Sequence, residues 1–117
     1  GNKYLIRDPG KNMNKIKIIY VTTKDKTEAQ KIGRHLVEER LAACVNIIDG
    51  MQSMYFWEGK VQEENEVILI AKTLEEKVSA VIQKVKELHS YDCPCIVSLP
   101  VEAGNKAFLK WVAEQVH

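Results

Sequence analysis

Hydrophobic and polar positions are patterned most clearly between residues 42 and 73, where two largely apolar segments flank a short polar turn. The first segment, residues 45–57, is rich in β-branched and aromatic side chains, and the second begins polar and closes in the apolar run 67–71. Such composition is typical of strands. Gly59, in the tip sequence Glu58-Gly59-Lys60, can adopt the positive φ that a tight hairpin turn requires. The pattern therefore predicts one long β-hairpin.

The arms of this hairpin are unusually long, because each exceeds twice the usual strand length of about five or six residues. Asp49-Gly50 interrupts the first arm, which predicts a bulge or bend. A hairpin of this length outruns the small domain that could cover it. Tyr55, Phe56 and Trp57, near the tip, would then stay exposed unless another chain covers them. The hairpin therefore predicts an oligomer.

Before the hairpin, the pattern predicts one strand and one helix. Residues 16–23 are apolar on both faces, which is typical of a central strand in a covered sheet. Asp25 followed by Glu28 resembles a capping box, and apolar residues then recur at helical spacing to about Leu41.

After the hairpin, the pattern predicts a helix, a loop, a strand and a last helix. Thr73 with Glu76 resembles a second capping box. Residues 89–94 are expected to form a loop because proline and the residue before it resist helix, and residues 96–99 a short strand ended by Pro100. Gly104-Asn105 is expected to cap the last helix, whose inward side chains would be Phe108, Leu109, Val112 and Val116.

The resulting order is β-α-β-β-α-β-α. Two βαβ halves that share one antiparallel sheet, with their helices on one face, make a ferredoxin-like α+β fold. We expect the third helix to cover the open sheet face or an edge. A single domain is predicted over residues 16–117, and residues 1–15, which have no usable apolar period, are interpreted as a flexible N-terminal extension.

Composition narrows the classes of function. The chain has 117 residues, 45% of them hydrophobic and 28% charged, with a formal net charge of +1. Because the charges alternate in sign and form no basic block, we expect no nucleic-acid partner. The apolar runs are too short for a membrane span and no signal peptide is visible, so we expect no membrane association and a cytoplasmic protein. The three cysteines are then expected to be reduced thiols.

Cys93-Pro94-Cys95 is the segment that most suggests metal chemistry. Two thiols at positions i and i+2 of an extended backbone point the same way, so they can approach one soft metal ion, and His89 can supply an imidazole nearby. The fourth ligand of a tetrahedral zinc site is not visible, and a purely structural loop is the alternative. Cys44, in the middle of a predicted strand, is interpreted as a small apolar side chain packed under a helix.

Sequence signals for catalysis are weak, and we expect that this protein is not an enzyme. His89 with Cys93 is the only candidate pair of base and nucleophile, and a structural loop is the favoured reading. There is no glycine-rich phosphate loop, so no organic cofactor is expected. Tyr55, Trp57 and Tyr91 could line a pocket or pack against a neighbouring subunit, and we favour the subunit contact.

Several segments together resemble the CutA family of divalent-cation tolerance proteins, and the resemblance covers about residues 16–116. Its most specific parts are the sequences VEERLAACVNI and WEGK, the latter including Glu58 and Lys60 beside the predicted subunit contact. The segments that carry it are Val21-Thr22, residues 36–47, residues 55–60, Lys72-Thr73, residues 89–94 and residues 99–101.

The resemblance implies a compact homotrimer, similar in architecture to the PII signalling proteins, in which strand ends of one subunit pair with the next. It also implies tolerance of copper and other divalent cations, with copper binding in some members. Cys44 falls on the recurrent strand cysteine of the family, and His89 and Tyr91 fall on its His-x-Tyr loop. Cys93 and Cys95 stand where many members carry Val and Glu, so a Cys-Pro-Cys ligand set is not a feature of the whole family.

Two classes of function remain open at this point. The first is a metal-responsive trimer that binds copper or similar ions through Cys93, Cys95, His89 and Cys44. The second is a PII-like signalling or scaffold trimer whose clefts hold a small ligand or a protein partner, with an indirect effect on metals. Stoichiometric uptake of metal by the reduced protein would separate them.

Overall fold

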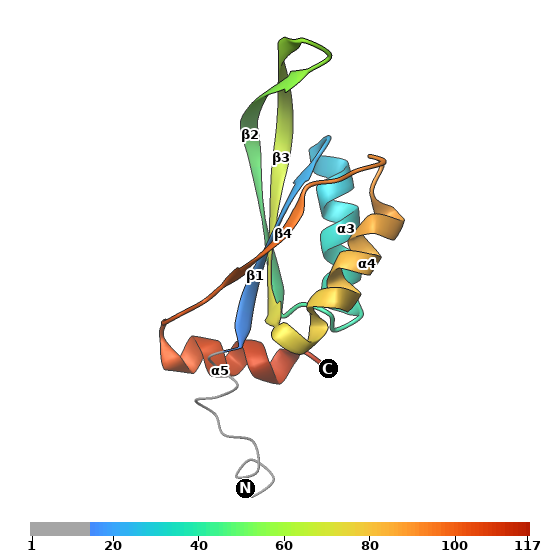
Figure 1. Ribbon diagram of the computed structural model, residues 1–117. Helices are drawn as coiled ribbons and strands as arrows, with labels where there is room; N and C mark the ends of the chain where they lie inside the picture. Colours follow the sequence, from blue (N-terminus) through green and yellow to red (C-terminus); the bar gives the residue numbers. More distant parts are fainter. Residues whose placement is uncertain (1–14) are drawn as a thin grey trace, which may run out of the picture.

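The computed structural model describes residues 15–117, which form a four-stranded antiparallel sheet and three α-helices (Figure 1). The strand order β2-β3-β1-β4 is that of a ferredoxin-like α+β fold and confirms the predicted fold class. Apart from Lys15, the extension predicted at residues 1–15 lies outside the described residues. The elements in chain order are β1 (Ile16–Thr23), α3 (Lys26–Glu38), β2 (Cys44–Trp57), β3 (Lys60–Leu74), the 3₁₀ turn η1 (Glu75–Lys77), α4 (Val78–Leu88), β4 (Ile96–Pro100) and α5 (Lys106–Gln115).

The sheet has one covered face and one open face. Helices α3 and α4 lie on the same side of the sheet (Figure 1), where the alternate β1 side chains Ile19 and Val21 are fully buried. The side chains between them point to the opposite face and are only half-buried. We call this opposite side the open face; cross-strand pairing places these apolar side chains on it: Ile18, Tyr20, Ile48, Ile68, Ile70, Val97 and Leu99.

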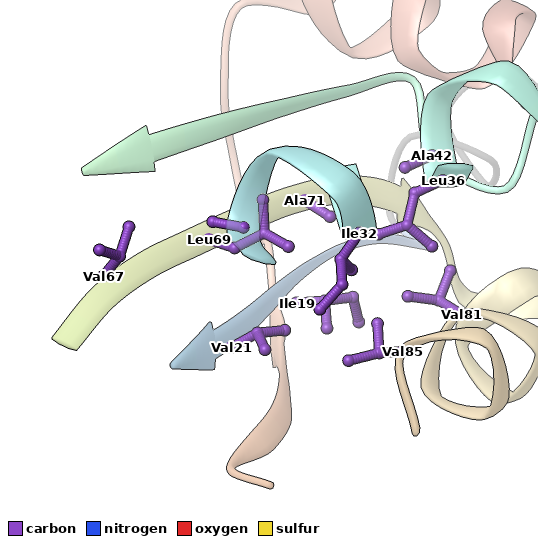
Figure 2. Packing of buried hydrophobic residues seen from close by; sticks show 11 residues of the cluster. Ile19, Val21, Ile32, Leu36, Ala42, Val67, Leu69, Ala71, Val81 and Val85 are labelled. Atoms are coloured by element: carbon purple, nitrogen blue, oxygen red, sulfur yellow. The ribbon is translucent and has the colours of Figure 1, made fainter. Parts of the chain in front are cut away.

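The main core lies between the sheet and the two helices, as Figure 2 shows. Ile32 and Leu36 of α3 and Val81 and Val85 of α4 are fully buried there against strands β1 and β3. Burying such a side chain contributes about 1.5–3 kcal/mol. This cluster fixes α3 and α4 on the sheet and thereby the loop that follows α4.

Helix α3 begins as predicted and ends earlier than predicted. The Asp25 carboxylate accepts the Glu28 backbone N–H at 2.8 Å, as an N-cap does. The helix stops at Glu38 instead of about Leu41, because Arg40 adopts φ 61°. The N–H groups of Arg40 and Leu41 then bond to the carbonyls of Val37 and Leu36, the Schellman pattern. Arginine replaces the usual glycine there, so the sequence carried no stop signal.

The hairpin of β2 and β3 has the predicted bulge and turn. Its ladder shifts register between Ile48 and Met51, around Gly50 with φ 80°. Glu58 and Gly59 form the two-residue turn, with φ of 52° and 80°, which is the primed geometry that matches strand twist. The strands hold 14 and 15 residues, and their far end extends well past the helices (Figure 1). The molecule measures 57 × 25 × 22 Å, an elongated shape due to this hairpin.

The capping box predicted at Thr73 is wrong. Thr73 belongs to β3 and is fully buried, and its hydroxyl donates to the Leu41 carbonyl oxygen at 2.6 Å. No side chain caps the start of α4, which follows the short turn η1. Strand β3 therefore uses the residues that the sequence pattern assigned to a helix start.

Helix α5 packs across one end of the sheet, against β1 and β3 (Figure 1). Its partner Ile16 alternates onto the same face as Ile18 and Tyr20, so α5 covers the end of the open face, one of the two placements predicted. The Asn105 side chain caps it by accepting the Ala107 N–H at 3.0 Å, as predicted. Leu109 and Val112 pack into a second core with Ile16 of β1. The predicted inward position of Phe108 is wrong, because its ring is exposed and stacks on Trp111 with centroids 5.8 Å apart. The inner face of α5 is therefore narrower than the pattern suggested.

In the described part of the chain, none of the helices has the length and apolar character needed to cross a membrane.

Candidate functional site

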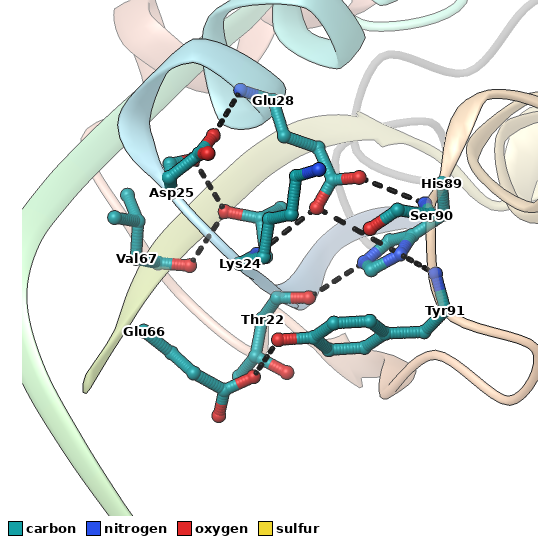
Figure 3. Close-up of polar contacts among 10 residues, drawn as sticks. Thr22, Lys24, Asp25, Glu28, Glu66, Val67, His89, Ser90 and Tyr91 are labelled. Atoms are coloured by element: carbon teal, nitrogen blue, oxygen red, sulfur yellow. Dashed lines mark hydrogen bonds and ion pairs between the residues drawn. The ribbon is translucent and has the colours of Figure 1, made fainter. Parts of the chain in front are cut away.

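The loop between α4 and β4, residues 89–95, is fixed to the start of α3 by one buried carboxylate (Figure 3). Glu28 is 7% exposed, and its two oxygens accept the backbone N–H groups of Lys24 at 2.9 Å and Ser90 at 2.8 Å. Burial opposes the charge of this carboxylate, but the hydrogen bonds from Lys24 and Ser90 hold its pKa below the ordinary 4.5. Glu28 therefore stays ionised and holds the loop.

His89 is used inside this loop. Its Nε2 donates to the Thr22 carbonyl oxygen at 2.8 Å, and its Nδ1 accepts the Tyr91 backbone N–H at 3.1 Å (Figure 3). The side chain is fully buried. Because the carbonyl oxygen can only accept and the amide can only donate, both ring nitrogens are occupied. This geometry argues against the predicted role of His89 as a metal ligand and gives it a structural one.

Tyr91 connects the loop to β3. Its hydroxyl donates to Glu66 at 2.8 Å, and Ser53 of β2 donates to the other Glu66 oxygen at 2.6 Å. The Tyr91 ring also lies 4.7 Å from the His89 ring, centroid to centroid. Burial, together with the Glu66 carboxylate, raises the pKa of the Tyr91 phenol well above its ordinary value, so the phenol remains a neutral donor. The first three residues of the loop are thus anchored to α3, β1 and β3.

These anchors leave a hollow of about 550 Å³ between the loop and the hairpin. We call it the hairpin hollow; its lining residues are Thr22, Tyr55, Trp57, Gln62, Glu64, Glu66, Tyr91, Cys93 and Cys95. Both loop thiols line it, and both cysteines are free and exposed. The expectation that Cys93 and Cys95 share one space therefore agrees with their placement.

The other candidate residues lie elsewhere. Cys44 opens β2 and is half-buried; its neighbour Val45 packs on the main core, so by strand alternation Cys44 points to the open face. The prediction that it lies under a helix is wrong. Glu58 lies in the hairpin turn and Lys60 begins β3, and neither lines the hollow. Within residues 15–117, His, Cys, Asp and Glu side chains nowhere gather in threes as a metal site would need.

The sequence did not single out Glu28, Thr22 or Glu66 as residues of the site. Glu66 is only 8% exposed and directly precedes the buried strand residue Val67. An acidic residue at the edge of an apolar strand was the one available signal, since a buried carboxylate needs partners. Those partners, Ser53 and Tyr91, come from two other parts of the chain, so the fold had to be known first.

Comparison with known protein families gives one match over nearly the whole described chain. The family model described as "CutA1 divalent ion tolerance protein" matches residues 17–115. The match spans both the hairpin and the loop that form the hollow.

Individual relatives agree with this match. A Xenopus laevis protein, "Protein CutA homolog", is 47% identical over 83% of this chain and 64% of its own length. The "Divalent-cation tolerance protein CutA" of Archaeoglobus fulgidus is 45% identical over 84% of this chain and 95% of its own. This chain thus spans less than two thirds of the frog relative and nearly all of the archaeal one.

Solved structures have the same fold. The crystal structure of CutA1 from Oryza sativa superposes with a TM-score of 0.86 at 39% identity, covering 88% of this chain and 94% of that one. The structure of the Archaeoglobus fulgidus protein, described as a periplasmic divalent cation tolerance protein, gives a TM-score of 0.84 over 87% of this chain and 99% of that one, at 43% identity.

Proposed function

This chain belongs to the CutA1 divalent ion tolerance protein family, and from that premise we propose that it is a homotrimeric protein that binds copper in the cellular response to metal ions. Divalent cations other than copper are further candidates. The single observation that carries the copper assignment is the placement of the Cys93 and Cys95 thiols, which are both free, both exposed and both in the lining of the hairpin hollow.

The chemistry of the donor set favours a soft ion. Thiolates select Cu(I) over hard cations such as Mg²⁺ and Ca²⁺, which take oxygen ligands. Exposure matters because an ion that arrives from solvent can reach an exposed thiol directly. His89 takes no part, since both its ring nitrogens are engaged. Cys93 and Cys95 would hold the Cu(I) ion, and its binding would be the event by which the protein responds to copper.

The trimer is supported by two unpartnered apolar surfaces on different parts of the chain. One is the open face of the sheet. The other is the outer side of the hairpin tip, where Met54 and Phe56 are 63% and 74% exposed and Val61 faces Phe56 across the ladder. Apolar side chains gathered on one surface in this way often mark a contact with another protein chain. A contact that joins two different surfaces of one subunit forms a cyclic ring when its rotation closes, and a ring of three copies would cover both surfaces.

We also propose a non-catalytic role in the cytoplasm. The one candidate nucleophile, Cys93, would need His89 as its base, and that imidazole already donates to Thr22 and accepts from Tyr91. The cytoplasm is proposed because thiols are kept reduced there. The archaeal relative is described as periplasmic, so measuring where this chain is located in the cell would test the cytoplasmic proposal directly.

The experiment is copper uptake by reduced protein, measured by equilibrium dialysis against a Cu(I) chelator. The parent should bind about one Cu(I) per subunit, and the double variant Cys93→Ser/Cys95→Ser should lose most of it while remaining folded. Cys44→Ala is the matched control, because it removes the one other thiol and should leave uptake unchanged. Equal uptake by the double variant and the parent would place the copper site elsewhere.

A further inference from the structure

The hairpin hollow has a second chemical feature besides its two thiols. Its volume of about 550 Å³ lies in the range of small-molecule sites. Three of its lining residues are aromatic: Tyr55 and Trp57 from β2 and Tyr91 from the loop. The hairpin and the loop, which lie far apart in the sequence, thus bring their aromatic rings to one space.

All the charge in the lining has one sign. Glu64 and Glu66 are the only ionisable carboxylates there, and the lining includes no Lys, Arg or His. Two negative charges at one wall repel an anion and attract a cation, and the effect is larger in a hollow than in open water. A nucleotide or another phosphate ligand, which needs cationic or N–H donors, is therefore disfavoured at this place.

The tyrosine hydroxyls are turned toward the carboxylates. Tyr55 donates to Glu64, and Tyr91 donates to Glu66. Because both tyrosine hydroxyls are neutral donors, Glu64 and Glu66 keep their negative charges, and no cationic side chain of the lining neutralises them. An aromatic ring attracts a cation held over its face, and Trp does so most strongly. Rings beside fixed negative charge are the arrangement that recognises alkylated ammonium groups.

We propose that the hairpin hollow binds a small organic cation, an ammonium group that carries alkyl substituents. The aromatic walls contributed by Tyr55, Trp57 and Tyr91 would contact the alkyl groups, and Glu64 and Glu66 would balance the charge. This inference goes beyond copper binding and is independent of it, because it uses the aromatic rings and carboxylates and not the thiols. It assigns a chemical class, an alkylated ammonium ion, to the small ligand that the second class of function would require.

The test is a titration of the assembled protein with choline, in which ligand-observed NMR measures binding. Its uncharged isostere, in which a tert-butyl group replaces the trimethylammonium, has nearly the same shape and measures the contribution of charge. Choline should bind, and the isostere should bind more weakly by roughly fivefold or more, the factor of about 1 kcal/mol expected for a cation over a ring. Equal binding of the two ligands would overturn the proposal.

Two variants locate the site. Glu64→Gln keeps an oxygen that Tyr55 can bond to but removes the charge, and it should weaken choline binding roughly threefold to fivefold. Glu63→Gln is the matched control, because Glu63 is the exposed neighbour that pairs with Met54 on the other side of the same strand. Choline affinity should be unchanged in the control. Equal weakening by both variants would show a general effect of charge and would contradict a site in the hollow.

The copper and ammonium proposals can fail separately. Cys93→Ser/Cys95→Ser should lose Cu(I) and still bind choline, because both thiols become hydroxyls of similar size. Trp57→Leu should weaken choline binding roughly fivefold or more and leave copper uptake in place. If Trp57→Leu binds choline as the parent does while remaining assembled by light scattering, the aromatic wall is not the binding surface and the ammonium proposal is wrong.

Discussion

Glu28 links helix α3 to the loop that carries the candidate ligands. Its carboxylate accepts the Lys24 and Ser90 N–H groups from two segments more than 60 positions apart in the sequence. A buried carboxylate that accepts N–H donors is stable only as an anion in a fixed position. We infer that Glu28 sets the position of Cys93 and Cys95 without touching a ligand itself.

Glu28→Gln should therefore lower stability at neutral pH by about 1.5–3 kcal/mol, the range for hydrogen bonds to a charged group. The pKa of Glu28 is lower in the folded protein than its ordinary 4.5, so its stabilisation is present above that pH and is lost as pH falls through the folded value. The difference between parent and variant should accordingly shrink below about pH 4.5. Urea unfolding at fixed protein concentration measures both.

Glu38→Gln is the control for this prediction. Glu38 lies on the same helix but is exposed, and among residues 15–117 its ion-pair partner is Arg34, at 3.4 Å. Its loss should change stability by less than about 0.5 kcal/mol at either pH. A pH-independent loss in Glu28→Gln would mean that the side chain acts by packing and not by charge.

At the scale of the elements, the hairpin turn carries a conformation that its sequence does not favour. Glu58 holds φ 52° in the turn, a region that non-glycine residues enter at a cost, whereas Gly59 beside it enters freely. Glycine therefore suits the second position of the turn, whereas glutamate is an unfavourable residue at the first position. Asn is far better tolerated than Glu in this conformation.

Glu58→Asn should stabilise the protein by about 0.5–1 kcal/mol, because it removes part of the cost of the left-handed conformation. The shift of the urea midpoint at constant slope measures the gain. Glu58→Val, with a β-branched side chain at the same φ, should destabilise instead. Similar midpoints for the Asn and Val variants would show that the turn does not hold this conformation in solution.

Helix α3 approaches β2 closely at Gly33. A Cβ atom added there would lie 2.9 Å from Val45 Cγ2, so the branched side chain would have to move. Alanine favours a helix by about 1 kcal/mol over glycine, and overpacking costs about 1–3 kcal/mol. Gly33→Ala should thus be neutral to destabilising by up to about 2 kcal/mol. Thermal unfolding of the single variant measures this.

The same substitution in a Val45→Ala background provides the control. Removal of the Val45 methyl groups makes room for the new Cβ, so Gly33→Ala should there be neutral or stabilising. An equal loss in both backgrounds would show that the contact with Val45 is not the cause.

The elements also show where sequence reasoning succeeds and where it stops. The bounds of β1, the bulge at Gly50 and the Asn105 cap were predictable because each depends on residues next to one another. Thr73 was assigned to a helix start because its partner, the Leu41 carbonyl, is 32 positions away. Phe108 was placed inward because helical spacing alone cannot tell which apolar residue lies at the margin of the buried stripe.

The same limit applies to the site. The cysteine pair was predictable from its spacing, and both thiols do line one hollow. The role of His89 was not, because its two hydrogen-bond partners include Thr22 of β1, 67 positions away. Glu64 and Glu66 join the hollow only when the hairpin arms are in register with Tyr55 and Ser53. Long-range pairing, not local pattern, therefore determines what surrounds the thiols.

At the scale of the whole molecule, the isolated subunit has more apolar surface than one chain can cover. The open face of the sheet and the hairpin tip both lack a partner within the described residues, and the molecule is more than twice as long as it is wide, at 57 × 25 × 22 Å. Obligate interfaces commonly bury more than about 2,000 Å² and resemble a domain core cut in half. The hairpin and the open face together offer a surface of that character.

Native mass spectrometry of the reduced protein with one equivalent of Cu(I) per subunit tests the central claim, that this chain is a copper-binding trimer. The account predicts one dominant species at three times the 13.3 kDa subunit mass, carrying up to three copper ions. The Cys93→Ser/Cys95→Ser variant should give the same trimer without copper. A monomer, or a parent trimer that carries no copper under these conditions, would contradict the account.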